Sequence, residues 1–223
     1  MRRREGPGRD VVLILSFGNG WLIDGERRES FAGGLRRSQV TTEHAGWSYG
    51  MHIGLVPWAA YALLGIPMHE LAETTVPLEG VLPRELAERL EDAATWDDRF
   101  ALLDDVLARR LNDARTASPG VVWAWEQLRS ADGQARVGSL AEELGWSRKR
   151  LVARFREQVG LPPKAVARLL RFERARRLAG QMSWAELALE CGFADQPHLI
   201  SEFQAFTGRA PETFLQDAPA VPE

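Results

Sequence analysis

The sequence is poor in the features that would mark a secreted, membrane-bound or disulfide-stabilised protein. It has a single cysteine, Cys191, which excludes an intrachain disulfide and a four-cysteine zinc site. No apolar run approaches the roughly 18 residues that a membrane-spanning helix needs. No small-residue cleavage site closely follows the apolar stretch at residues 11–17. We therefore expect a cytoplasmic protein with no membrane partner.

The small net charge of −3 hides a local excess of basic residues. Residues 147–177 contain 11 arginines and lysines against two acidic residues, Glu157 and Glu173. Such a segment favours a polyanionic partner such as nucleic acid, although a charge run also arises on a solvated helix face. The composition is ordinary for a globular protein, and 223 residues are enough for one or two domains.

The chain divides into two regions of different pattern. Short β-prone runs between glycine-rich turns fill residues 11–60 and predict a small sheet or partial β-barrel. Helices are expected afterwards at 57–65, 84–90, 96–111, 139–144, 147–158, 163–178, 184–190, 195–206 and 211–215. The Pro/Gly-containing segment 116–120 is the best boundary. The fold class is therefore α+β, with a first domain at 1–118, an all-α domain at 119–217, and flexible tails at 1–10 and 218–223.

The C-terminal region contains an internal repeat. The segment Leu140-Ala-Glu-Glu-Leu-Gly-Trp aligns with Leu187-Ala-Leu-Glu-Cys-Gly-Phe at an offset of 47 residues. One extra residue raises the offset to 48, and four further pairs then align: Leu151 with Leu199, Phe155 with Phe203, Gly160 with Gly208, and Pro163 with Pro211. Two copies of one unit are thus joined by the helix expected at 163–178.

Each unit has the pattern of a helix-turn-helix. A glycine, Gly145 or Gly192, allows the left-handed turn that a side chain resists. A capping residue, Ser147 or Asp195, then begins the second helix. A leucine and a phenylalanine four residues apart face the core, so the opposite face of that helix is exposed. A helix that exposes hydrogen-bond donors in this way can enter a DNA major groove about 12 Å wide.

These exposed faces contain the candidate DNA-binding residues. Arginine and lysine can reach guanine or phosphate oxygens, and glutamine can pair with adenine. The first helix offers Arg148, Lys149, Arg150, Ala153 and Arg154, and the second offers Gln196, Pro197, His198, Ser201 and Gln204. The expected phosphate contacts are Arg156 and, on the joining helix, Arg168, Arg171 and Arg174, for which a structural role is an equal alternative.

The repeat matches a known pattern over residues 119–217. Its strongest elements are the two units, their spacing and the string Gly192-Phe-Ala-Asp-Gln-Pro-His-Leu. These residues resemble the DNA-binding domain of AraC/XylS-type regulators. The resemblance implies two helix-turn-helix units bridged by a long helix, recognition helices in adjacent major-groove faces, and a sequence-specific transcription regulator. Family members often carry arginine at the positions of Ala153 and Ser201, which implies weaker or different base reading here, with the second unit mostly positioning the protein.

A weaker resemblance lies before residue 118. Residues 53–78, which begin Ile53-Gly-Leu-Val-Pro-Trp-Ala-Ala-Tyr, look like the cupin-derived sensor region that precedes some AraC-type domains. This implies a shortened partial β-barrel that senses a ligand or dimerises. The candidates to line an apolar ligand pocket, with core packing as the alternative, are Trp21, Trp47, Tyr49 and Trp58. We expect no metal and no cofactor, because the histidines include no His-x-His pair.

Two rival functions remain open. Gly46-Trp-Ser-Tyr-Gly matches the nucleophile elbow of serine hydrolases, but residues 41–45 form a poor buried strand, so we expect no enzyme. The main alternative is an adaptor whose first domain does the work, with DNA contact weakened by Ala153 and Ser201. The favoured partner is double-stranded DNA. RNA polymerase, a small-molecule effector and a second copy of the chain are left open as further partners.

Overall fold

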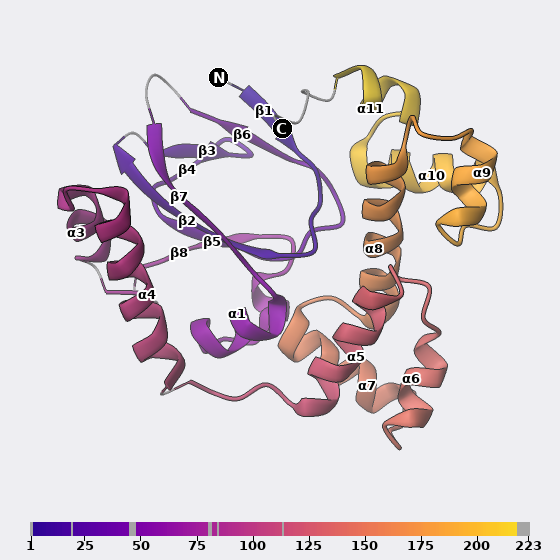
Figure 1. Ribbon diagram of the computed structural model, residues 1–223, viewed down its shortest axis with the longest axis horizontal. Coiled ribbons are helices and arrows are strands. Elements are labelled where there is room, and N and C mark those ends of the chain that lie inside the picture. Colours follow the sequence, from indigo (N-terminus) through magenta and orange to yellow (C-terminus); the bar gives the residue numbers. More distant parts are fainter. Residues whose placement is uncertain are drawn as a thin grey trace.

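Two antiparallel sheets form the first half of the protein and a group of helices forms the second half (Figure 1). The computed structural model describes residues 2–18, 20–44, 48–79, 82–83, 85–112 and 114–217. The predicted α+β class, with strands first and helices after, is confirmed. Among the described residues, no helix is both long and apolar enough to cross a membrane.

The first sheet has the strand order β1-β6-β3-β4. Its strands are β1 (Arg2–Glu5), β6 (Val40–Glu43), β3 (Trp21–Ile23) and β4 (Glu26–Arg28). The prediction of a flexible tail at residues 1–10 is wrong for residues 2–5, because Arg2 to Glu5 pair in antiparallel register with β6. An ion pair of 3.1 Å between Arg2 and Glu43 adds to this pairing. The backbone groups at the edge of β6 therefore order the basic start of the chain.

The second sheet has the order β7-β2-β5-β8 and supplies most of the core of the first domain. Its strands are β2 (Val11–Gly18), β7 (Ser48–Leu55), β5 (Phe31–Gly33) and β8 (Thr75–Pro77). Every second residue of β2 is buried: Val11, Leu13, Leu15 and Phe17. This period of two places one face of the sheet against the helices of the same domain.

Four helices pack with this sheet: α1 (Pro57–Leu64), α2 (Met68–Leu71), α3 (Leu86–Asp92) and α4 (Trp96–Asn112). Helix α1 starts with Pro57 in its first turn and ends at Gly65, whose φ of 69° is left-handed. The helix predicted from residue 84 begins at Leu86. Leu86, Leu90 and Leu103 bring α3 and α4 into the core.

Seven helices follow: α5 (Pro119–Ser130), α6 (Val137–Glu143), α7 (Arg148–Val159), α8 (Pro163–Leu178), α9 (Trp184–Glu190), α10 (Gln196–Thr207) and α11 (Pro211–Asp217). Helix α8 joins two separate cores. Val166 and Leu170 pack in the core of the first unit, whereas Leu169 and Phe172 pack in the core of the second. The predicted tail at 218–223 lies outside the described residues.

The two halves of the chain are in direct contact. Helices α1 and α2 pack against α7, and the hydroxyl of Tyr61 donates to a Glu157 oxygen at 3.5 Å. The amide of Gln39 donates to the backbone carbonyl of Thr207 at the end of α10. The helices of both units are therefore held against the first half of the chain.

Candidate nucleic-acid interface

The first helix-turn-helix unit consists of α6, a tight turn and α7. Gly145 in the turn has a φ of 61°, and the Ser147 hydroxyl accepts a hydrogen bond from the Arg150 backbone N–H at 3.2 Å. This cap fixes where α7 begins. Leu151 and Phe155 are fully buried on one side of α7. The expected inward face is confirmed, and the opposite face is free for contact.

All candidate residues of α7 are exposed: Arg148, Lys149, Arg150, Ala153, Arg154 and Arg156. Two of them have partners within the protein. The guanidinium of Arg150 lies 4.7 Å from the Trp146 ring centre, and Arg154 forms an ion pair of 3.0 Å with Glu157. Within the described part of the chain, Arg148, Lys149 and Arg156 have neither an ion-pair partner nor a cation-π contact. They are the basic groups of α7 most available to a polyanion.

The second unit consists of α9, a turn at Gly192 and α10. Ser183 and Glu186 form a reciprocal capping box at the start of α9, and these hydrogen bonds lower the pKa of the Glu186 carboxyl. Asp195 caps α10 by accepting from the His198 N–H at 2.8 Å. Cys191 is buried in the turn, and burial raises the pKa of its thiol. It acts as a small packing residue between α9 and α10.

The candidate face of α10 is less basic and partly held in place. Pro197, Ser201 and Gln204 are exposed, whereas Gln196 and His198 are half-buried. The Nδ1 atom of His198 accepts from the Ala194 N–H at 3.3 Å, and its ring lies edge-on to Phe193. This surface offers amide and hydroxyl groups but no lysine or arginine.

The three candidate arginines of α8, Arg168, Arg171 and Arg174, each have partners inside the protein. Arg168 pairs with Glu202 of α10 at 3.0 Å, and Arg171 donates to the Gly133 carbonyl at 2.9 Å. Arg174 forms ion pairs with Asp132 at 2.7 Å and with Glu190. Burial lowers the pKa of Arg171, since its guanidinium is half enclosed by protein. These contacts favour the structural role for α8, and phosphate contact by its arginines stays a prediction.

The aromatic candidates of the first domain do not meet in one pocket. Trp21 packs edge-on against His44 at 5.0 Å, and Tyr49 packs against Phe17 at 5.3 Å on the other sheet. Trp58 on α1 is the candidate that lines a cavity. Trp47 lies outside the described residues. The structure thus separates the residues that the sequence grouped as one ligand site.

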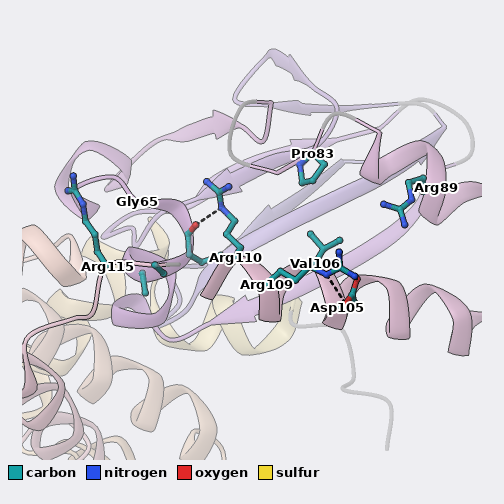
Figure 2. A pocket seen from close by; sticks show the side chains of 11 residues that line it. Gly65, Pro83, Arg89, Asp105, Val106, Arg109, Arg110 and Arg115 are labelled. Carbon is teal, nitrogen blue, oxygen red and sulfur yellow. Dashed lines mark hydrogen bonds and ion pairs between the residues drawn. The ribbon is translucent and has the colours of Figure 1, made fainter. Parts of the chain in front are cut away.

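A larger cleft beside the Trp58 cavity is lined by residues that the sequence did not single out. A cleft of about 590 Å³ between α1, α3 and α4 is lined by Arg89, Arg109, Arg110 and Arg115 (Figure 2). The sequence does contain the Arg109-Arg110 pair in the last turn of α4, but such a pair is typical of a solvated helix end. Only the packing of α1 and α3 beside α4 shows that the pair lines a cleft.

The hydrolase alternative lacks its structural context. Ser48 is the first residue of β7, so a strand follows the serine where a nucleophile elbow requires a helix.

Within the residues that the structure describes, no group of three or more His, Cys, Asp or Glu could hold a metal ion.

A family profile described as a helix-turn-helix domain matches residues 140–217. This match spans both units and the helix that joins them. Residues 140–217 are an AraC/XylS-type helix-turn-helix domain. The match supports DNA binding in transcription regulation as the function of this domain. Comparison with curated protein sequences gave no match.

The solved structures that are similar to this chain include two of ToxT and one of AraT. ToxT from Vibrio cholerae is 13% identical with a TM-score of 0.53, over 97% of each chain. An unsaturated fatty acid-bound ToxT from V. cholerae strain SCE256 is 12% identical with a TM-score of 0.51, over 99% of this chain and 93% of that one. The C-terminal domain of AraT, a response regulator from Geobacillus stearothermophilus, is 19% identical with a TM-score of 0.43, over 49% of this chain and 95% of that one. The ToxT matches show that the two-part fold extends beyond the AraC/XylS-type domain.

Proposed function

We propose that this chain is a sequence-specific regulator whose helices α7 and α10 enter adjacent major-groove faces on one side of a duplex. The observation that carries the proposal is the pairing of two capped helices, each with an apolar face in its own core and a polar face exposed. Because α8 contributes side chains to both cores, the two helices are held as one body. A preformed spacing of this kind suits two successive groove faces.

The two helices have different roles in this proposal. Helix α7 reads bases through Lys149 and Arg150 and contacts phosphates through Arg156, because its exposed face is basic. Helix α10 offers Gln196, Ser201 and Gln204, and we assign to it mainly the positioning of the protein on the backbone. Residues 119–217 are the DNA-binding domain in this scheme, and residues 1–118 are the regulatory domain.

We further propose that residues 1–118 sense a small molecule and form a homodimer. ToxT, of similar fold, is described with an unsaturated fatty acid bound, which supports the sensing role. The exposed aromatic pair Trp96 and Phe100 at the start of α4, with ring centres 6.0 Å apart, supports a contact with a second copy. Contact with RNA polymerase would follow if the regulator activates transcription. The function is binding, with no catalytic step.

Salt dependence of DNA binding tests the proposal against an adaptor function. A specific regulator loses affinity steeply as salt rises, yet keeps a ratio of about 10³ or more between its operator and random DNA at physiological salt. An adaptor would show only weak binding that is equal on all sequences. The matched control is Arg129→Gln, which removes an exposed arginine of α5 that pairs with Glu126. This variant should bind like the parent protein.

A further inference from the structure

The cleft that Figure 2 shows is basic in a chain of negative net charge. Its lining includes four arginines and one acidic residue, Asp105, which gives three net positive charges. Asp105 pairs with Arg109 at 2.7 Å. Within the described part of the chain, Arg89, Arg110 and Arg115 have no carboxylate partner. Figure 2 shows these arginines spread along the cleft, with Arg115 toward one end and Arg89 toward the other. Unpaired guanidinium groups that line a concave site attract anions, since the walls of the cleft concentrate their field.

One of these arginines is held in place by the fold. The Nε atom of Arg110 donates to the Leu63 carbonyl at 2.8 Å, which satisfies one of the last carbonyls of α1 (Figure 2). Neither Nη atom of Arg110 has a partner among the described residues. A guanidinium fixed through Nε presents its remaining N–H groups as a planar fork, the geometry that matches a carboxylate or phosphate.

A second, smaller cavity adjoins the cleft, and we call it the annexe. It has a volume of about 200 Å³ and shares Ala62, Ala114 and Arg115 with the cleft. Its other walls are mainly apolar, with Trp58, Leu111 and Val122 among them. Leu111 is 46% exposed. An apolar group in this annexe would cover Leu111.

We infer that the cleft and its annexe bind one amphipathic organic anion, with a carboxylate or phosphate head held by the arginines of the cleft, of which Arg115 also lines the annexe, and a short apolar part against Trp58 and Leu111. The inference deepens the proposed sensing role of residues 1–118, and its regulatory consequence rests on that proposed function. Sites of this kind combine apolar walls with a few polar groups that fix the orientation of the ligand.

The position of the annexe links such a ligand to the DNA-binding helices. Val122 belongs to α5, the first helix after the boundary, and Trp58 packs against the cores of both the first domain and the first helix-turn-helix unit. Helix α1, which holds Trp58, also packs against α7. A ligand in the annexe therefore contacts the segments through which the first domain touches α7. If the ligand binds one arrangement of the two domains more tightly than another, it raises the population of that arrangement. The DNA affinity of the protein would then change with ligand concentration.

The test is a calorimetric titration of the full chain without DNA, using sodium octanoate below its micelle concentration. Octan-1-ol and octylammonium have the same chain with a neutral or positive head, and inorganic phosphate is a head without a chain. We expect saturable one-to-one octanoate binding, at least ten-fold tighter than that of the other three compounds. Equal affinity for the three eight-carbon compounds, no octanoate binding, or phosphate binding as tight as octanoate would overturn the inference.

Two variants locate the site. Arg115→Gln removes an exposed, unpaired charge, and Ala114→Leu fills space shared by both cavities, so each should weaken octanoate binding at least ten-fold. Arg129→Gln, about two helical turns beyond Val122 on α5 and outside the lining of both cavities, should leave it unchanged. Octanoate binding that survives both cleft variants would place the ligand elsewhere and reject the site. If octanoate binds but the protein shows no specific DNA binding, the proposed function fails while the ligand site stands.

Discussion

Gly160, which ends helix α7, lies against the backbone of Met68 in helix α2. A Cβ atom on Gly160 would stand 2.9 Å from the Met68 carbonyl oxygen, and the φ of Gly160 is 102°. Helix α7, the candidate recognition helix, therefore ends in close contact with helix α2 of the first domain. This close approach, together with the packing of α1 and α2 on α7, couples the position of α7 to the first domain.

Gly160→Ala should destabilise the protein and loosen this junction. The new methyl group meets a backbone oxygen that cannot move aside, and alanine resists a left-handed φ, so we expect a loss of about 2–3 kcal/mol in the free energy of unfolding. The control is Gly145→Ala, which has a φ of 61° but open space around its Cβ position and should lose only about 1 kcal/mol. Chemical denaturation measures both. Equal losses would show that the Met68 contact does not constrain Gly160.

Lys149→Ala should relax base preference at one position of the operator. Lys149 is exposed on α7 and has no ion-pair partner in the described residues, so its ammonium group is free to reach a base edge. We expect a loss of about 1–3 kcal/mol on the preferred operator and less on an operator changed at that position. Binding titrations on a panel of single-base operator variants measure the effect. A uniform loss over the whole panel would contradict base reading by Lys149.

Arg156→Ala should instead weaken all DNA sequences alike. We assign Arg156 to phosphate, which carries no sequence information. The slope of log affinity against log salt should fall by about 1 in this variant. An unchanged slope would remove Arg156 from the interface. Arg171 is a poor probe of phosphate contact, because Arg171→Ala also removes the hydrogen bond to Gly133.

Asp195→Ala should fray the start of α10. The Asp195 carboxylate accepts the His198 N–H at 2.8 Å, and loss of such a cap costs about 0.5–2 kcal/mol. Gln196 lies in the affected turn, so DNA affinity should fall with stability. Asp195→Asn, which keeps an oxygen acceptor, should restore most of both. Thermal unfolding and DNA titration of the two variants report the result, and an equal effect of Ala and Asn would exclude capping as the cause.

Glu173 should make stability depend on pH. Burial raises the pKa of its carboxyl, against the Arg9 backbone hydrogen bond of 3.0 Å that lowers it. Because the folded-state pKa lies above the unfolded value, stability relative to Glu173→Gln is greatest below about pH 4.5. It should fall as pH rises through the folded-state pKa and level off above it. Denaturation of both proteins across this range measures the difference, and a difference that grows with pH would show that the Arg9 contacts dominate.

The C-terminal helices were predictable because their signals are local. Pro163 fixes the start of α8, its apolar spacing fixes the length, and the observed bounds are those predicted. Ser147 and Asp195 cap α7 and α10 as their spacing from the turn glycines indicated. In each case the decisive residues lie within a few positions of the element they define.

Features that depend on distant partners were not predictable. Strand β1 exists because residues 40–43 offer an edge, and nothing in Arg2 to Glu5 indicates that edge. The arginine cleft exists because α1, α3 and α4 meet in space. The partners of Arg168 and Arg174 come from residues 16 or more positions away in the chain. Their charge pattern alone could not separate a phosphate contact from an internal ion pair.

Selection of random duplex DNA by the full-length protein at physiological salt tests the central claim most directly. If α7 and α10 are held by α8 at the spacing of successive groove faces, the enriched DNA should contain two short elements about one helical turn apart. Lys149→Ala should degrade one of these elements and leave the other intact. Failure to enrich any motif, with weak and salt-sensitive binding to every sequence, would contradict the claim that this chain reads DNA sequence.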